Sequence, residues 1–82
     1  MQVTVKSFAQ IREIMGNEDI TVSLNDGADM ASLCESLKQQ DSKWQEIFSD
    51  PVLMACNQSI VTPSHTLNDN DEVAILPPVT GG

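Results

Sequence analysis

The chain has 82 residues, enough for one domain, and its 40% hydrophobic content is typical of a folded protein. Its formal charge of −8 at pH 7 comes from 12 acidic and only four scattered basic residues, which argues against nucleic acids and anionic membrane surfaces as partners because both attract a clustered basic face. The acidity instead favours steered docking onto a basic protein.

The first part of the chain predicts two strands joined by a short helix. Residues 2–8 alternate apolar and polar side chains as a strand does, and residues 20–24 repeat that alternation. Between them, residues 9–15 place apolar side chains on one side of a helix that ends at Gly16. We expect the two strands to pair as a hairpin.

The middle of the chain predicts two helices. Asp29 is placed to cap the first of them, because its carboxylate can accept the free amide hydrogens of the first turn. Apolar side chains then recur at i, i+3, i+4 and i+7, and they are Met30, Leu33, Cys34 and Leu37. Burial against a sheet explains this stripe better than a cofactor or partner role does. Residues 42–45 resemble a capping box, which predicts a second helical segment that begins at Ser42 and ends before Pro51.

The last part of the chain predicts short strands. Residues 52–56 form an apolar strand, residues 57–59 turn the chain into residues 60–61, and residues 72–76, EVAIL, form the final strand. The resulting order favours an α+β fold in which one main helix covers one face of a mixed four- to five-stranded sheet. Chains with this order commonly adopt the ubiquitin-like β-grasp roll. We expect a β-grasp domain over residues 1–76 and an extended tail over residues 77–82.

No grouping of residues predicts an active site, a metal site or a bound cofactor in this chain alone. His65 directly follows Ser64, and neighbours in a loop seldom form a nucleophile–base pair, so a loop-bracing role is the better interpretation. Residues 68–72 fail the spacing of a calcium-binding loop. They suit a tight turn in which Asn70 adopts the left-handed conformation.

The cysteines predict a reducing compartment. Cys34 and Cys56 have apolar neighbours and no CxxC spacing, so we expect free, buried thiols. The N-terminal run MQVTVKSF has the pattern of a strand and not that of a basic segment followed by an apolar core. We therefore expect a cytoplasmic protein.

The final strand predicts a docking surface. If Val73 and Ile75 face the core, Ala74 and Leu76 face outward, where a lone domain should place polar groups. An apolar outer surface of this kind, extended by Met54, indicates a partner. The alternative is a short strand that is buried on both faces.

The ending PPVTGG predicts a carrier arm. Pro77 and Pro78 cannot continue the sheet and favour a stiff, extended exit. Val79 to Gly82 can span about 13 Å, and two residues without side chains, Gly81 and Gly82, suit a narrow channel. The reactive group would be the carboxylate of Gly82, activated by transfer to AMP from ATP and then converted to a thiocarboxylate.

Five segments closely resemble the small-subunit family of molybdopterin synthase: FAQIRE, the Trp44 region, MACNQ, HTLNDNDEVA and PPVTGG. The resemblance covers essentially the whole chain and implies a β-grasp fold, no bound cofactor and no catalysis by this chain alone. It implies that an ATP-dependent activating enzyme adenylates Gly82, which then becomes a thiocarboxylate. The tail would enter the large subunit of a heterotetrameric synthase, where sulfur passes to cyclic pyranopterin monophosphate during molybdenum cofactor biosynthesis.

The resemblance also assigns roles to residues. Gly81 and Gly82 would carry the chemistry, and docking would fall on Ala74, Leu76, Pro77, Pro78, Val79 and Thr80. The chain departs from the family at two places: Ile75-Leu76 stands where aromatic residues are frequent, and Asn70 stands where glycine is usual.

Two other functions remain open on the sequence. One is a sulfur carrier of the same chemistry that serves thiamin synthesis or tRNA thiolation. The other is a ubiquitin-like modifier or a plain interaction module, for which the terminal glycines would respectively form amide links to other proteins or be dispensable.

Overall fold

The computed structural model describes residues 1–16 and 18–77, with the backbone alone at residues 9 and 10. Eight elements follow one another in the order predicted from the sequence. They are β1 (Gln2–Ser7), α1 (Ala9–Met15), β2 (Ile20–Ser23), α2 (Met30–Gln40), α3 (Ser42–Phe48), β3 (Leu53–Cys56), β4 (Ser59–Ile60) and β5 (Glu72–Leu76).

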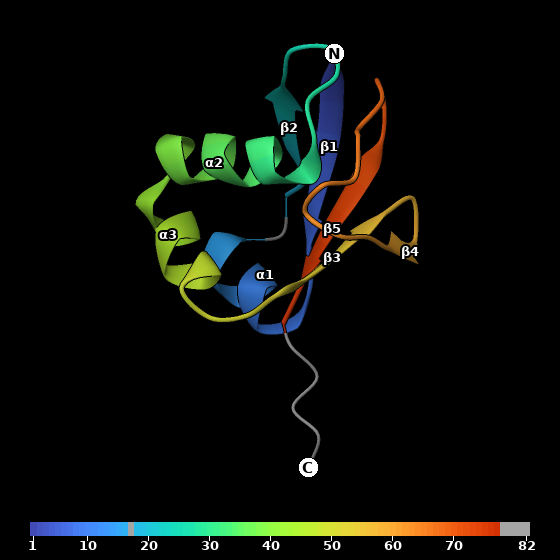
Figure 1. The fold of residues 1–82 in the computed structure, drawn as a ribbon. Helices are drawn as coiled ribbons and strands as arrows, with labels where there is room; N and C mark the ends of the chain where they lie inside the picture. The colour runs from blue at the N-terminus through green and yellow to red at the C-terminus, as the bar shows by residue number, and fades with distance from the viewer. Residues whose placement is uncertain (17, 78–82) are drawn as a thin grey trace.

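The strands form one mixed five-stranded sheet in the order β2-β1-β5-β3-β4. The predicted hairpin of β1 and β2 is confirmed, with Val3 opposite Val22 in antiparallel register. The last strand, β5, runs parallel to β1 at the centre of the sheet and antiparallel to β3 on its other side. The first and last strands of the chain are therefore neighbours in the middle of the sheet, and because they run parallel, the start of β1 and the end of β5 lie at opposite ends of it (Figure 1).

The helices cover one face of this sheet and enclose the core. On α2, the predicted stripe is buried at Met30, Leu33 and Leu37, each 0% exposed, while Cys34 is half-buried. From α3, Trp44 is 1% exposed and stacks on Phe48 with ring centroids 5.5 Å apart. The single main helix of the prediction is thus α2, and the shorter α1 and α3 complete the same layer.

Two helices, α2 and α3, each follow an aspartate that caps them. The predicted cap of α2 is confirmed, because the Asp29 carboxylate accepts the N–H of Ser32 at 2.9 Å. The predicted capping box at Ser42 is wrong by one residue. Asp41 has the extended backbone that a cap needs (φ −151°, ψ 127°) and accepts the N–H of Lys43 at 2.9 Å, so Ser42 is the first residue of α3.

Residues in the left-handed backbone conformation form tight turns in this fold. Asn70 has φ +68°, as the sequence predicted, and precedes the entry into β5. Asn57 (φ +50°) and Gln58 (φ +73°) connect β3 to β4, and two successive positive φ values are typical of a hairpin turn whose twist matches that of the strands. Within residues 1–16 and 18–77, no helix has the length and apolar character needed to cross a bilayer.

Candidate docking surface and tail root

Strand β5 presents its two sets of side chains to opposite faces of the sheet. Val73 and Ile75 are 0% exposed beneath the helices. Ala74 and Leu76 are only partly buried on the other face. The predicted orientation of the strand is confirmed, and the alternative of a strand fully buried on both faces does not hold.

Strand pairing places further apolar side chains beside Ala74 and Leu76. Leu53 lies opposite Leu76, Ala55 lies opposite Ala74, and Ile60 in turn lies opposite Ala55. Paired residues share a face of the sheet. Phe8 follows β1 with an extended backbone, which continues the alternation of the strand and puts this ring on the same face as Lys6, the residue opposite Ala74. We call this set the outer apolar face: Phe8, Leu53, Ala55, Ile60, Ala74 and Leu76.

Four members of the outer apolar face, Phe8, Leu53, Ala55 and Ile60, were not predicted from the sequence, and Ala55 among them is only 5% exposed. Phe8, Leu53 and Ile60 are large hydrophobic residues that remain 41%, 36% and 63% exposed. The sequence did indicate the outward orientation of Phe8, because it continues the every-second-residue series of Thr4 and Lys6 in the first predicted strand. For the other three, the face depends on how β3 pairs with β5 and with β4, which no local pattern reveals.

Met54 does not extend this surface, contrary to the sequence-based expectation. It lies opposite Ile75 and therefore faces the helices. Its Sδ atom is 3.5 Å from the Sγ atom of Cys34 on α2. Residues 52–56 are all apolar, so no alternation of polar and apolar side chains shows which of them face the helices.

Charged groups border the outer apolar face. Lys6 Nζ lies 3.6 Å from a carboxylate oxygen of Glu72 and 3.9 Å from one of Asp19. These three side chains are 37% to 53% exposed, and the water around them screens the ion pairs, which therefore add little stability. They place two carboxylates next to the apolar surface, which suits a basic partner.

A buried carboxylate fixes the start of β5. Asp71 accepts the N–H of Asn68 at 2.8 Å, the side-chain amide of Asn57 at 3.0 Å and the thiol of Cys56 at 3.4 Å. Burial raises the pKa of Asp71, but these hydrogen bonds outweigh it and hold the pKa below its ordinary value. The side chain of Asn57 also accepts the N–H of Glu72 at 3.0 Å, which ties the β3–β4 turn to the first residue of β5.

The two thiols are free, as predicted, but only Cys56 is buried, because Cys34 remains partly exposed. Burial raises the pKa of the Cys56 thiol to about 11, and the hydrogen bond to Asp71 and its negative charge add to that rise. Burial likewise raises the pKa of Cys34. A protonated thiol is a weak nucleophile, so neither cysteine suits a sulfur-transfer step.

His65 and Ser64 do not form a nucleophile–base pair. The Ser64 hydroxyl lies 3.0 Å from the hydroxyl of Thr62, and the carbonyl of His65 accepts the N–H of Met30 at 2.9 Å. His65 thus braces the loop against the start of α2.

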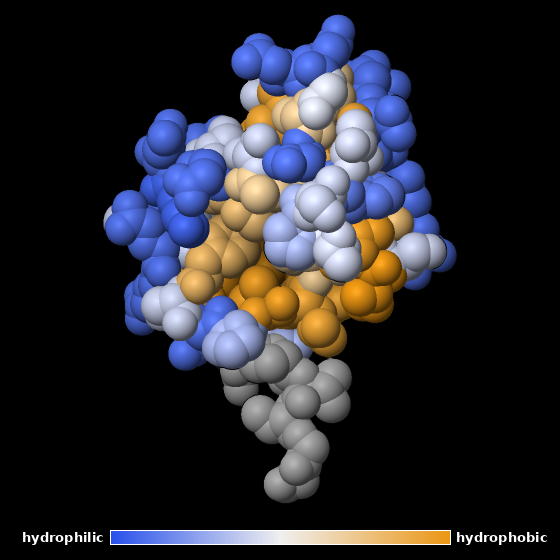
Figure 2. All heavy atoms as spheres, viewed as in Figure 1, coloured by the Kyte–Doolittle hydropathy of each residue, from blue (hydrophilic) through white to orange (hydrophobic). Residues whose placement is uncertain are grey.

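The chain leaves the sheet beside a small apolar hollow. Its volume is about 90 Å³, and we call it the tail-root groove; its walls are Ile11, Ile14, Ile47, Asp50, Pro51, Val52 and Pro77. Figure 2 shows hydrophobic residues gathered at this end of the molecule, directly above the grey segment. The other predicted tail residues, Pro78, Val79, Thr80, Gly81 and Gly82, lie outside the described part of the chain, so their roles stay predictions.

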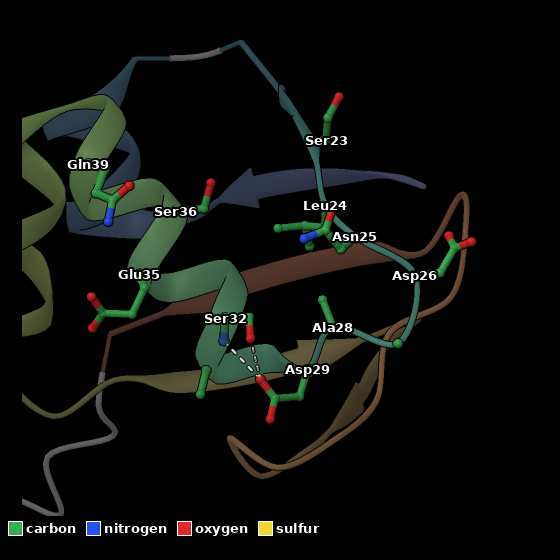
Figure 3. A pocket seen from close by; sticks show the side chains of 12 residues that line it. Ser23, Leu24, Asn25, Asp26, Ala28, Asp29, Ser32, Glu35, Ser36 and Gln39 are labelled. Atoms are coloured by element: carbon green, nitrogen blue, oxygen red, sulfur yellow. Dashed lines mark hydrogen bonds between the residues drawn. The ribbon is translucent and has the colours of Figure 1, made fainter.

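A second, wider hollow of about 790 Å³ lies between β2 and α2. Its wall includes three carboxylates, those of Asp26, Asp29 and Glu35. Figure 3 shows the Asp29 carboxylate turned towards Ser32, whose N–H and hydroxyl lower the pKa of Asp29. This hollow adjoins Ser23, which pairs with Gln2 at the opposite end of the sheet from Leu76, so it is remote from the predicted site.

Known proteins resemble this chain over its whole length. The molybdopterin synthase sulfur carrier subunit of Escherichia coli is 40% identical, over 98% of this chain and 99% of that protein. A structure of molybdopterin converting factor subunit 1 from Pyrococcus furiosus superposes with a TM-score of 0.81 at 30% identity, covering 95% of this chain and 98% of that one. A complex of subunits 1 and 2 of molybdopterin-converting factor from Helicobacter pylori contains a chain that superposes with a TM-score of 0.72 at 24% identity, and each chain is covered completely.

These likenesses confirm the predicted β-grasp fold and agree with the mixed sheet and helical layer described above. The sequence pattern of the ThiS family matches residues 5–82, which include all of β5 and the tail. The chain therefore belongs to the ThiS family.

Proposed function

We propose that this chain is the sulfur carrier subunit of a molybdopterin synthase and that Gly82 carries the sulfur as a thiocarboxylate. The relatives that share 30% or more of its sequence over its whole length bear that name. One observation about the molecule supports the proposal most: an exposed apolar surface ends at Leu76, directly before the segment PPVTGG. The surface that would contact the partner is therefore continuous in sequence with the tail that would enter it.

The proposed chemistry requires activation of the terminal carboxylate. The carboxylate of Gly82 attacks the α-phosphorus of ATP, and pyrophosphate leaves, which gives an acyl adenylate on an activating enzyme. A sulfur nucleophile then displaces AMP and leaves a thiocarboxylate. In the synthase, the thiocarboxylate sulfur forms a C–S bond to cyclic pyranopterin monophosphate as a C–O bond of that substrate breaks. Water then hydrolyses the acyl–sulfur bond, which restores the carboxylate of Gly82 and leaves the sulfur on the pterin. Two such transfers build the dithiolene of molybdopterin.

The described residues support a carrier role for this chain and a catalytic role for its partner. Both free cysteines have raised pKa values, which makes their thiols poor sulfur carriers and favours the terminal carboxylate of Gly82 for that role. The chain has only four basic residues, so the cations that bind a phosphate-bearing pterin would come from the large subunit. The complex of two subunits in the Helicobacter pylori relative supports a partner of that kind. We place the reaction in the cytoplasm.

The test is the intact mass of the protein after incubation with the activating enzyme, ATP and a sulfur donor. We expect the wild-type mass to rise by the difference between one sulfur and one oxygen atom. Deletion of Gly82 should abolish the rise, whereas a Thr21→Ala control, which changes an exposed residue of β2, should retain it. No rise in the wild type, or an equal rise in the deletion variant, contradicts the proposal.

Two further measurements separate the alternative functions. Rescue of a strain that lacks its molybdopterin synthase small subunit supports the proposed pathway, and rescue only of thiamin or tRNA thiolation mutants supports the other carriers. Amide linkage of Gly82 to lysines of other proteins would identify a modifier.

A further inference from the structure

The tail-root groove lies on the opposite side of the sheet from the outer apolar face. Its walls come from α1, α3 and the loop that leads into β3, all of which belong to the helical layer. The two apolar features meet where β5 ends, because Leu76 belongs to the outer apolar face and Pro77 is a wall of the groove. The tail therefore starts between two apolar surfaces.

We propose that the tail-root groove is a second contact for the large synthase subunit, which inserts one aliphatic side chain there and places a lysine or arginine against Asp50. This inference rests on the proposed function and deepens it. The large subunit would hold the root of the tail from both sides, which fixes the direction in which the tail enters.

The exposure and size of the groove support an aliphatic occupant. Ile14 is 43% exposed, although α1 buries its neighbour Ile11 to 4% exposure. A volume of about 90 Å³ suits a single aliphatic side chain and not a larger ligand. Covering Ile14 and the half-buried Val52 with another apolar group removes that surface from water, which favours binding.

The charge of the groove supports a basic neighbour. Asp50 is the one charged residue among the groove walls that the structure describes, and it is exposed at the rim. The whole chain carries a formal charge of −8, so a partner surface rich in lysine or arginine complements it.

The course of the chain supports the choice of partner. Pro77 is half-buried at the groove, and the residues that follow it are the ones that the proposed function places inside the large subunit. A protein that encloses the tail from this point onward must lie against the surroundings of Pro77. A partner that touched the outer apolar face alone would leave the groove and Ile14 in water.

The experiment measures the affinity of the full-length chain for the isolated large subunit by titration calorimetry. Ile14→Ser and the nearly isosteric Val52→Thr change the apolar walls, and Asp50→Lys reverses the charge at the rim. We expect each to weaken binding about tenfold, which corresponds to about 1.4 kcal/mol. Gln45→Ala, at an exposed and uncharged residue of α3, is the control and should bind as the wild type does. Thermal unfolding of each variant checks that the fold is retained.

The outcomes separate this inference from the proposed function. Wild-type affinity in Ile14→Ser and Val52→Thr, combined with weaker binding in Leu76→Asp, overturns the groove contact and leaves the proposed function standing. If the wild-type chain does not bind the large subunit, both fall. Weaker binding of the three groove variants with an unchanged Gln45→Ala control supports the contact.

Discussion

Asp71 connects the turn before β5 with the β3–β4 hairpin through three hydrogen bonds to one carboxylate. We predict that Asp71→Asn destabilises the fold by about 1–3 kcal/mol at neutral pH, because it leaves buried donors unpaired. The folded-state pKa of Asp71 lies below the ordinary value of 3.8. The stabilisation is therefore present above that ordinary value and is lost as the pH falls through the folded-state pKa.

Urea unfolding of the wild type and of Asp71→Asn at several pH values measures this effect. The difference in the free energy of unfolding should be largest near neutrality and should shrink below about pH 4. Asp50→Asn, at an exposed carboxylate, serves as the control for the titration of other groups. A difference between Asp71→Asn and the wild type that stays constant down to low pH would contradict the role of the ionised carboxylate.

At the scale of elements, the packing of α2 on the sheet depends on the apolar side chains along one side of the helix. Leu33, in the first half of the helix, is 0% exposed and belongs to the core cluster that also contains Val22 and Ile75. We predict that Leu33→Ala lowers the free energy of unfolding by about 2–5 kcal/mol, because the substitution loses buried apolar surface and leaves a cavity. For a domain of this size, whose total stability is of order 5–15 kcal/mol, that loss is a large fraction.

The fluorescence of Trp44 reports this unfolding, since it is the one tryptophan of the chain and is 1% exposed in the folded state. Gln39→Ala, at an exposed position of α2, should change the stability by less than about 0.5 kcal/mol. Equal stabilities of the two variants would show that the helix does not need its stripe for docking onto the sheet.

Most elements of this fold were predictable because local patterns specify them. Alternation identified β1 and β2, helical spacing identified α2, and the bounds of α1, α3 and β5 agree with the prediction. The cap of α3 was misplaced because Asp41 and Ser42 are adjacent and both are good caps, so only the backbone conformation decides between them.

Much of the docking surface was not predictable, for a different reason. Ala74 and Leu76 could be assigned to the outer face because their strand alternates with core residues. Met54 was assigned to the wrong face and Leu53 was missed, because residues 52–56 are apolar throughout and their orientation is set by pairing with a strand about 20 residues away. The tail itself is predicted from PPVTGG and lies largely outside the described residues.

At the scale of the whole molecule, the formal charge of −8 and the apolar surfaces around the end of β5 act on different steps of binding. Long-range attraction to a basic partner accelerates the encounter, while apolar contacts and the inserted tail determine how long the complex lasts. The charge is spread over exposed helices as well as over the rim of the outer apolar face. Glu35 on α2 and Glu46 on α3, for example, are both exposed and lie outside the predicted site.

We predict that the association rate constant with the large subunit falls at least about tenfold as the ionic strength rises from about 0.01 M to about 1 M, because the Debye length shrinks from about 30 Å to about 3 Å. The dissociation rate constant should change little. The double variant Glu35→Gln/Glu46→Gln reduces the formal charge from −8 to −6, and it should associate more slowly at low salt with an unchanged dissociation rate. Leu76→Asp should show the reverse pattern, with faster dissociation, because it removes apolar contact while the net charge becomes more negative. Stopped-flow kinetics measure both rates, and an association rate that does not respond to salt would show that charge has no part in the encounter.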